Sequence, residues 1–200
     1  MRRYLIEQAL FMKNDPLSYL NNQFLVAMPQ LECSEFSNSL VYLISHNTEG
    51  AMGIIVNKEK PFHLADILEQ LRPDTLFPAV NLMTPIYHGG PIDTERGFVL
   101  HSKDNVFQNT INLPDIQLTS SQDVLIDIAE KKGPENYLIA LGYAGWGAGQ
   151  LEQEIIENTW LTCPFNADII FKVASEQRVD AALEQLGVNF SSLSRHVGHA

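Results

Sequence analysis

Three short apolar runs near the start of the chain predict buried β-strands, at residues 24–28, 40–44 and 51–57. Runs of about four to eight apolar residues between turn formers are typical of strands that are buried on both faces. Residues 46–50, His-Asn-Thr-Glu-Gly, supply such turn formers between the second and third runs. The sequence therefore predicts an antiparallel hairpin with a longer loop in this region.

Periodic apolar positions predict the helices. Leucine and isoleucine recur at i, i+3, i+4 and i+7 within residues 63–71, which predicts one amphipathic helix. A second helix is predicted after a cap at Ser120 or Ser121, with Asp123 in its first turn, where an acid complements the free N–H groups and the helix dipole. The Lys-Lys-Gly-Pro sequence at residues 131–134 predicts its end.

Strands outnumber helices in the remaining sequence. Strands are predicted at residues 86–88, 97–101, 109–113, 137–141 and 167–173, and helices at residues 150–158 and from a Ser175 cap to Gly187. This order is not a regular alternation of strand and helix, which argues against a doubly wound parallel sheet. We therefore expect an α+β fold with a largely antiparallel, strongly curved sheet. No repeat or linker divides the chain, so a single domain over residues 21–200 is expected, after a partly disordered N-terminal extension at residues 1–20.

The segment at residues 142–154, Gly-Tyr-Ala-Gly-Trp-Gly-Ala-Gly-Gln-Leu-Glu-Gln-Glu, is predicted to join an apolar strand to an amphipathic helix. Free N–H groups at such a junction can bind an anion, but the segment has neither a G-x-G-x-x-G pattern nor a P-loop lysine. Glu152 and Glu154 would also repel a phosphate. Close packing of strand and helix is the favoured interpretation, with Trp146 over the core. The alternative is a pocket for a neutral or cationic small molecule, walled by Tyr143 and Trp146.

Other candidate binding residues lie beside predicted strands. Gly89 and Gly90 are favoured as part of a turn, and the alternative is an exposed backbone rim beside a pocket. His88 and His101 border apolar strands, and Arg96 lies between them. A histidine at a strand end is more often a hydrogen-bonded structural residue than a base, because proton transfer needs an acid within hydrogen-bond reach. A structural role is therefore favoured for both histidines.

Gln150, Glu154 and Asn158 recur at i, i+4 and i+8, so they share one face of the predicted helix. That polar row either lines a cleft or forms a solvated face with i,i+4 hydrogen bonds, and the second interpretation is favoured. His196 and His199 have a spacing that suits a metal only in a helix, which Gly198 disfavours. No metal site and no cofactor are expected, and hydrolase chemistry lacks a G-x-S-x-G elbow.

Composition narrows the class of partner. The net charge of −11 disfavours duplex DNA as a direct partner, because phosphates require clustered Lys and Arg. Cys33 and Cys163 form no CxxC pair, which favours reduced thiols in a cytoplasmic protein, and a single long-range disulfide is the alternative. No apolar run approaches the roughly 18 residues of a membrane span, and a signal peptide is rejected, so no membrane partner is expected. Translation from Met1 or from Met12 stays open.

Several motifs follow one another in a fixed order along nearly the whole chain. They are FLVAMP at 24–29, FSNSLVY at 36–42, GAMGIIVN at 50–57, YHGGP at 87–91, RGFVLH at 96–101, the glycine segment at 142–154, NTW at 158–160 and the terminal GHA. In this order they resemble the AlgH-like (YqgE/AlgH) family over about residues 24–200. The family usually has a proline soon after the asparagine that Asn57 matches, and here that proline is delayed to Pro61.

The resemblance implies a bifurcated, largely antiparallel β-sheet folded into a pseudo-barrel with helices packed outside. It also implies a soluble bacterial protein of the cytoplasm. It implies no settled activity, although members are often labelled transcriptional regulators.

Three functional hypotheses follow from the sequence. We favour a non-enzymatic regulatory or adaptor protein that acts through contacts with a protein partner, whose identity the sequence leaves open together with the oligomeric state. The second hypothesis is a small-molecule binder or enzyme with a cleft near Trp146, His101 and Arg96. The third is a DNA-binding transcriptional regulator, which follows the family label and which the negative charge disfavours. Whether the protein is an enzyme stays open, with the balance against it.

Overall fold

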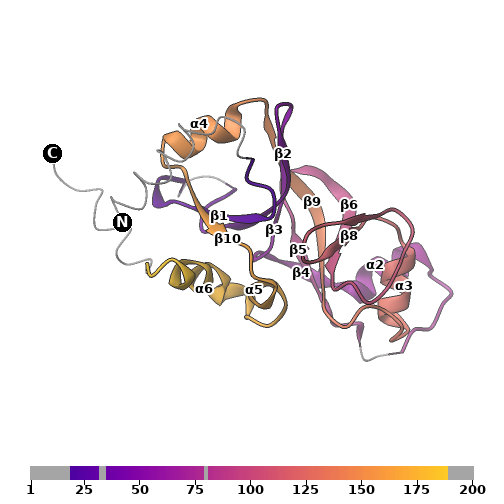
Figure 1. The fold of residues 1–200 in the computed structure, drawn as a ribbon. Helices are drawn as coiled ribbons and strands as arrows, with labels where there is room; N and C mark the ends of the chain where they lie inside the picture. Colours follow the sequence, from indigo (N-terminus) through magenta and orange to yellow (C-terminus); the bar gives the residue numbers. More distant parts are fainter. Residues whose placement is uncertain (1–18, 32–34, 79–80, 189–200) are drawn as a thin grey trace.

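The computed structural model describes residues 19–31, 35–78 and 81–188 (Figure 1). Nearly all of the expected N-terminal extension lies outside these residues, as do both candidate start sites. Cys33 and the tail with His196 and His199 also lie outside them.

A ten-stranded β-sheet is the frame of the fold. Its strands are β1 Gln23–Ala27, β2 Leu40–Asn47, β3 Gly50–Ile55, β4 Glu59–His63, β5 Pro85–His88, β6 Ile92–His101, β7 Thr110–Asn112, β8 Gln117–Thr119, β9 Tyr137–Gly147 and β10 Trp160–Pro164. The order is β10-β1-β2-β3-β9-β6-β8-β7, and the β4–β5 pair branches from β9. Only the pairing of β5 with β9 is parallel among these strands. The branched sheet curls into a half-barrel, which confirms the predicted fold class.

Five α-helices lie in the described residues. They are α2 Leu64–Leu71, α3 Asp123–Ala129, α4 Gln150–Ile156, α5 Ala167–Phe171 and α6 Arg178–Gln185, with short 3-10 turns η1 Pro29–Leu31 and η3 Ser175–Gln177. Figure 1 shows α4 on one side of strands β1 and β10, and α5 and α6 on the other. Helices α2 and α3 pack on the other half of the sheet. None of these helices has the length and apolar character to cross a membrane.

Burial on both faces explains why β1 and β2 are continuous apolar runs. Successive side chains of a strand point to opposite faces of the sheet. Phe24 and Val26 therefore enter the core shared with α5 and α6. Leu25 and Ala27 enter a second core, beneath α4. The sheet half that contains β5 and β6 has its own core under α2 and α3.

Strand β9 belongs to both halves of the sheet, and glycines make its change of partners possible. Its first part pairs with β5 and β6, and its last four residues pair with β3. Gly142, between the two parts, has a φ of 77°, and a Cβ there would lie 2.4 Å from the Gly90 carbonyl oxygen. Gly90 has a φ of 151°, and its own Cβ would lie 2.2 Å from the Tyr143 carbonyl carbon. Only glycine allows this approach of two backbones. Much of the predicted glycine junction is therefore strand, which corrects the expected end of the strand at residue 141.

The strand predicted at residues 167–173 is wrong, because the chain forms α5 there. The side chain of Asn166 accepts a hydrogen bond from the Asp168 N–H and so caps the helix. A short apolar run does not distinguish a buried strand from a buried helical turn, and here the cap decides. The strand of this region is β10, which pairs with β1 and was not predicted.

Three predicted boundaries also need correction. The β2–β3 hairpin closes tightly, because Asn47 pairs with Gly50, so the longer loop is wrong. Ser121 does not cap α3, which begins after Gln122; its hydroxyl donates to an Asp123 carboxylate oxygen. Ser175 lies in η3 and donates its hydroxyl to Glu59 Oε1 at 2.7 Å. Each serine hydroxyl donates a hydrogen bond to a carboxylate, which is a stronger acceptor than a neutral oxygen, and neither serine caps a helix.

Candidate functional site

One carboxylate joins the two tryptophans of the chain. Trp146 Nε1 and Trp160 Nε1 donate to Glu154 Oε2 at 2.8 and 2.7 Å. Gln150 Nε2 donates to Glu154 Oε1 at 2.9 Å, and Gln150 Oε1 accepts from the Gly147 N–H at 3.0 Å. We call these residues, Trp146, Gln150, Glu154 and Trp160, the tryptophan network.

The tryptophan network is a structural connection between α4 and the sheet. The indole rings meet edge to face with centroids 5.8 Å apart, and both are buried. Burying an indole N–H without an acceptor costs free energy, and Glu154 removes that cost for two indoles at once. Asn158 lies beyond the end of α4 with a φ of 59°, so it does not continue the helical row that Gln150 and Glu154 form.

A histidine–carboxylate pair on the same side of the sheet was not foreseen. The Leu20 N–H donates to His46 Nδ1 at 3.0 Å, so Nε2 carries the hydrogen and donates to Glu152 Oε1 at 3.0 Å. The histidine is 3% exposed. Its place in the sequence, among turn-forming residues, gave no signal of this pairing. The pair connects the start of the described chain to β2 and α4.

His101 is a buried, hydrogen-bonded residue. Its Nδ1 donates to the Ser102 carbonyl oxygen at 2.8 Å, and its Nε2 lies 2.8 Å from Thr119 Oγ1. Burial lowers the pKa of His101, which outweighs the hydrogen bond to Ser102. Burial likewise lowers the pKa of His88, with Lys60 as a further cause. The neutral imidazole of His101 is thus the form that the fold favours.

The structure does not bring His101 and Trp146 together. His101 pairs with Tyr137 at the start of β9, whereas Trp146 lies near the end of that strand. A strand rises about 3.3 Å per residue, so Tyr137 and Trp146 lie at opposite ends of β9, and His101, which lies on β6 beside Tyr137, is far from Trp146. Gly89 and Gly90 are buried where the sheet branches: the Gly89 N–H donates to the Leu141 carbonyl at 2.8 Å.

Arg96 and Tyr143, by contrast, line one pocket of about 300 Å³. We call it the arginine pocket; it is lined by Ile44, Ser45, Met52, Arg96, Phe98, Asn109, Ile111, Leu113, Leu118, Ser120 and Tyr143. The guanidinium carbon of Arg96 lies 5.2 Å from the centre of the Phe98 ring. Two of the residues selected from the sequence therefore share a concave, largely apolar surface.

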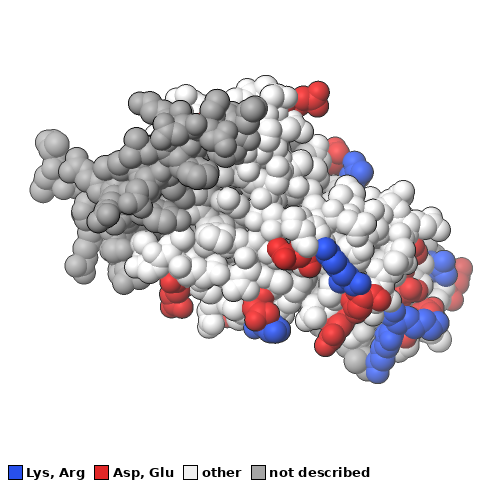
Figure 2. All heavy atoms as spheres, in the orientation of Figure 1, with Lys and Arg blue, Asp and Glu red and all other residues white. Residues whose placement is uncertain are grey.

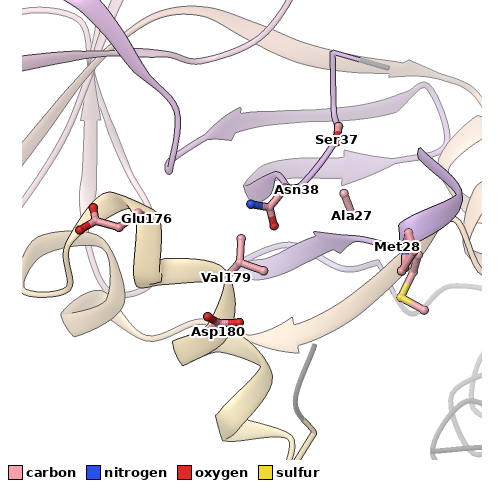
Figure 3. A pocket seen from close by; sticks show the side chains of 8 residues that line it. Ala27, Met28, Ser37, Asn38, Glu176, Val179 and Asp180 are labelled. Atoms are coloured by element: carbon pink, nitrogen blue, oxygen red, sulfur yellow. The ribbon is translucent and has the colours of Figure 1, made fainter. Parts of the chain in front are cut away.

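A second pocket, of about 390 Å³, lies between the η1 region and the η3–α6 segment. We call it the acidic pocket; it is lined by Ala27, Met28, Pro29, Ser37, Asn38, Glu176, Val179 and Asp180. Figure 3 shows Glu176 and Asp180 on the helical side, across from the loop that carries Ser37 and Asn38. Sequence reasoning missed this pocket, although acids spaced i, i+4 and i+8 at Glu176, Asp180 and Glu184 were a readable signal.

Aromatic and amide contacts fix the loop side of the acidic pocket. Phe36 packs against both rings of the tryptophan network, at centroid distances of 6.3 Å to Trp146 and 5.5 Å to Trp160. Asn57 Nδ2 donates to the Asn38 carbonyl at 2.8 Å, and Asn57 Oδ1 accepts from the Leu40 N–H at 2.8 Å. The loop is therefore anchored at both the pocket and the sheet.

A buried arginine fixes the helical side of the acidic pocket. Arg178 is 6% exposed and donates to the carbonyl oxygens of Val173 and Val56. Its guanidinium carbon lies 4.9 Å from the centre of the Tyr87 ring. Because this cation points into the protein, it does not offset the acids at the surface of α6.

Acidic side chains are spread over the face shown in Figure 2, and the basic side chains there are interspersed with them. The exposed cation nearest in sequence to α6, Lys172, is paired with Asp168 at 2.8 Å. Glu176, Asp180 and Glu184 form no ion pair with any residue that the structure describes. The acidic pocket therefore keeps its negative charge unneutralised by the described chain.

These features define a half-barrel α+β protein whose buried polar groups connect its layers and whose pockets have opposite charge. The chain belongs to the AlgH-like family, because the model of that family matches residues 24–191. A UPF0301 protein of Pseudomonas putida strain W619 is 54% identical over 94% of this chain and all of its own length. A UPF0301 protein of Stutzerimonas stutzeri strain A1501 is 51% identical with the same coverage.

Two solved structures have a similar fold. The solution structure of the AlgH protein from Pseudomonas aeruginosa is 48% identical, with a TM-score of 0.77 over 92% of this chain and 97% of that one. A crystal structure of a protein from Corynebacterium diphtheriae is 20% identical, with a TM-score of 0.60 over 84% and 87% of the two chains. The second likeness concerns the fold alone.

Proposed function

We propose that the protein is a non-enzymatic adaptor or regulatory protein of the cytoplasm that recognises a basic segment of a partner protein. The observation that carries the proposal is the acidic pocket, whose lining includes Glu176 and Asp180 and in which neither acid forms an ion pair with the described residues. Opposite charges on two proteins steer their encounter and fix specificity. A lysine or arginine side chain of the partner is the complement of this surface.

The burial and hydrogen bonding of the other ionisable groups support a recognition role. The side chains of Glu154, His46 and His101 form hydrogen bonds with other parts of the protein. Cys163 is buried, and burial raises the pKa of its thiol to about 11, so the reactive thiolate is scarce at neutral pH. The free thiol of Cys163 also agrees with a reducing compartment. In the acidic pocket, by contrast, neither Glu176 nor Asp180 forms an ion pair with the described residues.

Affinity capture from cells that express the full chain at its native level tests the proposal. We compare the wild type with Glu176→Lys/Asp180→Lys, which reverses the charge of the acidic pocket. The matched control is Glu69→Lys/Asp74→Lys, which makes the same change at exposed acids on and beyond α2. We expect a specific partner with a basic segment to be recovered by the wild type and the control and lost with the pocket variant.

Binding of that basic segment as a synthetic peptide should weaken as salt rises, because the charges are partly solvated. Fluorescence anisotropy at several salt concentrations measures this. A partner that binds both double variants equally, or the absence of any specific partner, would contradict the proposal.

Duplex DNA as a direct partner is not part of the proposal. The chain has 13 basic and 24 acidic residues, and Lys132 is paired with Glu130 at 2.7 Å. Release of counterions from phosphates requires clustered cations and gives DNA binding a steep negative salt dependence. We expect no saturable binding to duplex DNA at low salt. Saturable binding with that steep dependence would favour the transcriptional-regulator hypothesis instead.

A further inference from the structure

The hollow of the half-barrel contains the arginine pocket, which is distinct from the proposed protein-binding surface. Most of its lining comes from β2, β3, β9, β6, β8 and β7, which follow one another in the sheet. Asn109, Leu113 and Ser120, which flank β7 and β8, complete the lining. Ile44, Phe98, Leu113 and Leu118 also belong to the core cluster that extends to α5 and α6. The pocket is therefore the open end of a packed hydrophobic core.

Arg96 is the one cation among the residues that line this pocket. It forms no ion pair or hydrogen bond with the described part of the chain, and its guanidinium lies over the Phe98 ring. A guanidinium stacked on an aromatic ring keeps its N–H donors free for a planar anion. No acid lines the pocket. In a chain of net charge −11, this combination marks a place for a negative ligand group.

We propose that the arginine pocket binds a small organic carboxylate with an apolar body, of which a medium-chain fatty acid is the simplest example. The apolar body would lie against Met52, Phe98 and Leu118, where removal of its surface from water is favourable. The carboxylate would accept two parallel N–H bonds from the Arg96 guanidinium. Asn109 and Ser120, which also line the pocket, supply further polar groups near its rim. A volume of about 300 Å³ suits a ligand at the small end of the range for such sites.

Calorimetric titration of octanoate into the full chain tests this proposal. Arg96→Gln removes the charge and keeps an amide, and Met52→Trp fills the apolar part of the pocket. Lys172→Gln, which removes an exposed cation on another surface, is the matched control. Octylamine, with the same chain and the opposite charge, tests the sign of the recognised group.

We expect octanoate to bind the wild type and Lys172→Gln alike. Arg96→Gln should weaken binding by about tenfold or more, because a charge-assisted hydrogen-bonded pair is lost. Met52→Trp should abolish binding, and octylamine should bind more weakly than octanoate.

Several outcomes would overturn the proposal. They are the absence of saturable octanoate binding to the wild type, an unchanged affinity in Arg96→Gln or Met52→Trp, and equal binding of octylamine. Circular dichroism and thermal unfolding establish that each variant is folded. If one pocket variant does not fold, the other variant and the comparison of octanoate with octylamine decide the question. Loss of partner capture through the acidic pocket would leave this result unaffected, so the two proposals fail separately.

Discussion

The tryptophan network and the two pockets lie on the same sheet, but they use charge in opposite ways. In the network, the Glu154 carboxylate accepts three hydrogen bonds from the protein itself. In the acidic pocket, Asp180 and Glu176 form no ion pair with the described residues, and Arg96 in the arginine pocket is equally unpaired. Phe36 physically connects the network to the loop of the acidic pocket.

This difference separates side chains that stabilise the fold from side chains available to a ligand. A polar group that is satisfied internally contributes stability and would be costly to expose. An exposed charge without a partner contributes little to stability and keeps its full interaction for another molecule. Stability and binding should therefore respond to different substitutions.

The largest effect is expected for Gly142→Ala, which places a side chain where β9 passes close to Gly90 before it reaches the tryptophan network. The new Cβ would lie 2.4 Å from the Gly90 carbonyl oxygen, at a φ of 77° that side chains rarely adopt. The free energy of unfolding should fall by about 4 kcal/mol or more. Gly187→Ala, at a φ of 67° with open space around its Cβ, is the control and should cost only about 1 kcal/mol. Urea unfolding measures both. Similar losses in the two variants would contradict the requirement for glycine where the backbones of Gly90 and Gly142 approach each other.

Next in size is Glu154→Ala, which leaves two buried indole N–H groups without their acceptor. We expect a loss of about 3 kcal/mol in the free energy of unfolding, because each hydrogen bond to a charged group contributes about 1.5 kcal/mol or more. Glu157→Ala, which removes an exposed acid that accepts from Gln153, should cost less than about 0.5 kcal/mol. Equal losses would show that the network is not a structural connection.

A smaller effect is expected from acidification. Burial lowers the pKa of His101 in the folded protein, so the unfolded chain binds the extra proton more readily. The corresponding stability is complete above the ordinary histidine pKa of about 6.5 and is lost as pH falls below it. Burial of His88 acts in the same direction. Urea unfolding at pH 7.5 and 5.5 should show this loss in the wild type and a smaller loss in His101→Gln; equal losses would contradict the assignment to His101.

The smallest effect on stability is expected at the pockets. Arg96→Gln should change the free energy of unfolding by about 0.5 kcal/mol, the value of an exposed cation–π contact. Glu176→Lys should change it by no more than a similar amount, because its charge has no ion-pair partner in the described chain. Chemical unfolding measures both. A loss of several kcal/mol at either position would show that the residue stabilises the fold, as the tryptophan network does.

The sequence predicted the fold class and most strands because apolar runs and glycines act locally, whereas the helix caps predicted at Ser121 and Ser175 were wrong. Gly187, for example, was predicted to end the last helix, and it follows the end of α6 with a φ of 67°. Strand β10 was not predicted, because its partner, β1, lies more than 130 residues away in the chain. The α5 region was misassigned because its two buried isoleucines fit a strand as well as a helical turn.

Candidate sites were harder to predict because they depend on which strands become neighbours. The chain gave no sign that Arg96 and Tyr143 would share a pocket while His101 would lie far along β9 from Trp146. The polar row of Gln150 and Glu154 was recognised, but its role required the position of Trp160, which only the fold supplies. Likewise, Glu176 of η3 and Asp180 of α6 line a pocket only because the fold places them near the loop at Ser37 and Asn38.

The most direct test measures unfolding free energy and partner capture together in two variants, Glu154→Gln and Glu176→Lys/Asp180→Lys. The account predicts that Glu154→Gln loses about 1 kcal/mol or more of stability and still captures the partner at temperatures where it is folded. It predicts that the double variant keeps its stability and loses the partner. The reverse pattern, with capture lost in folded Glu154→Gln and retained in the double variant, would contradict it.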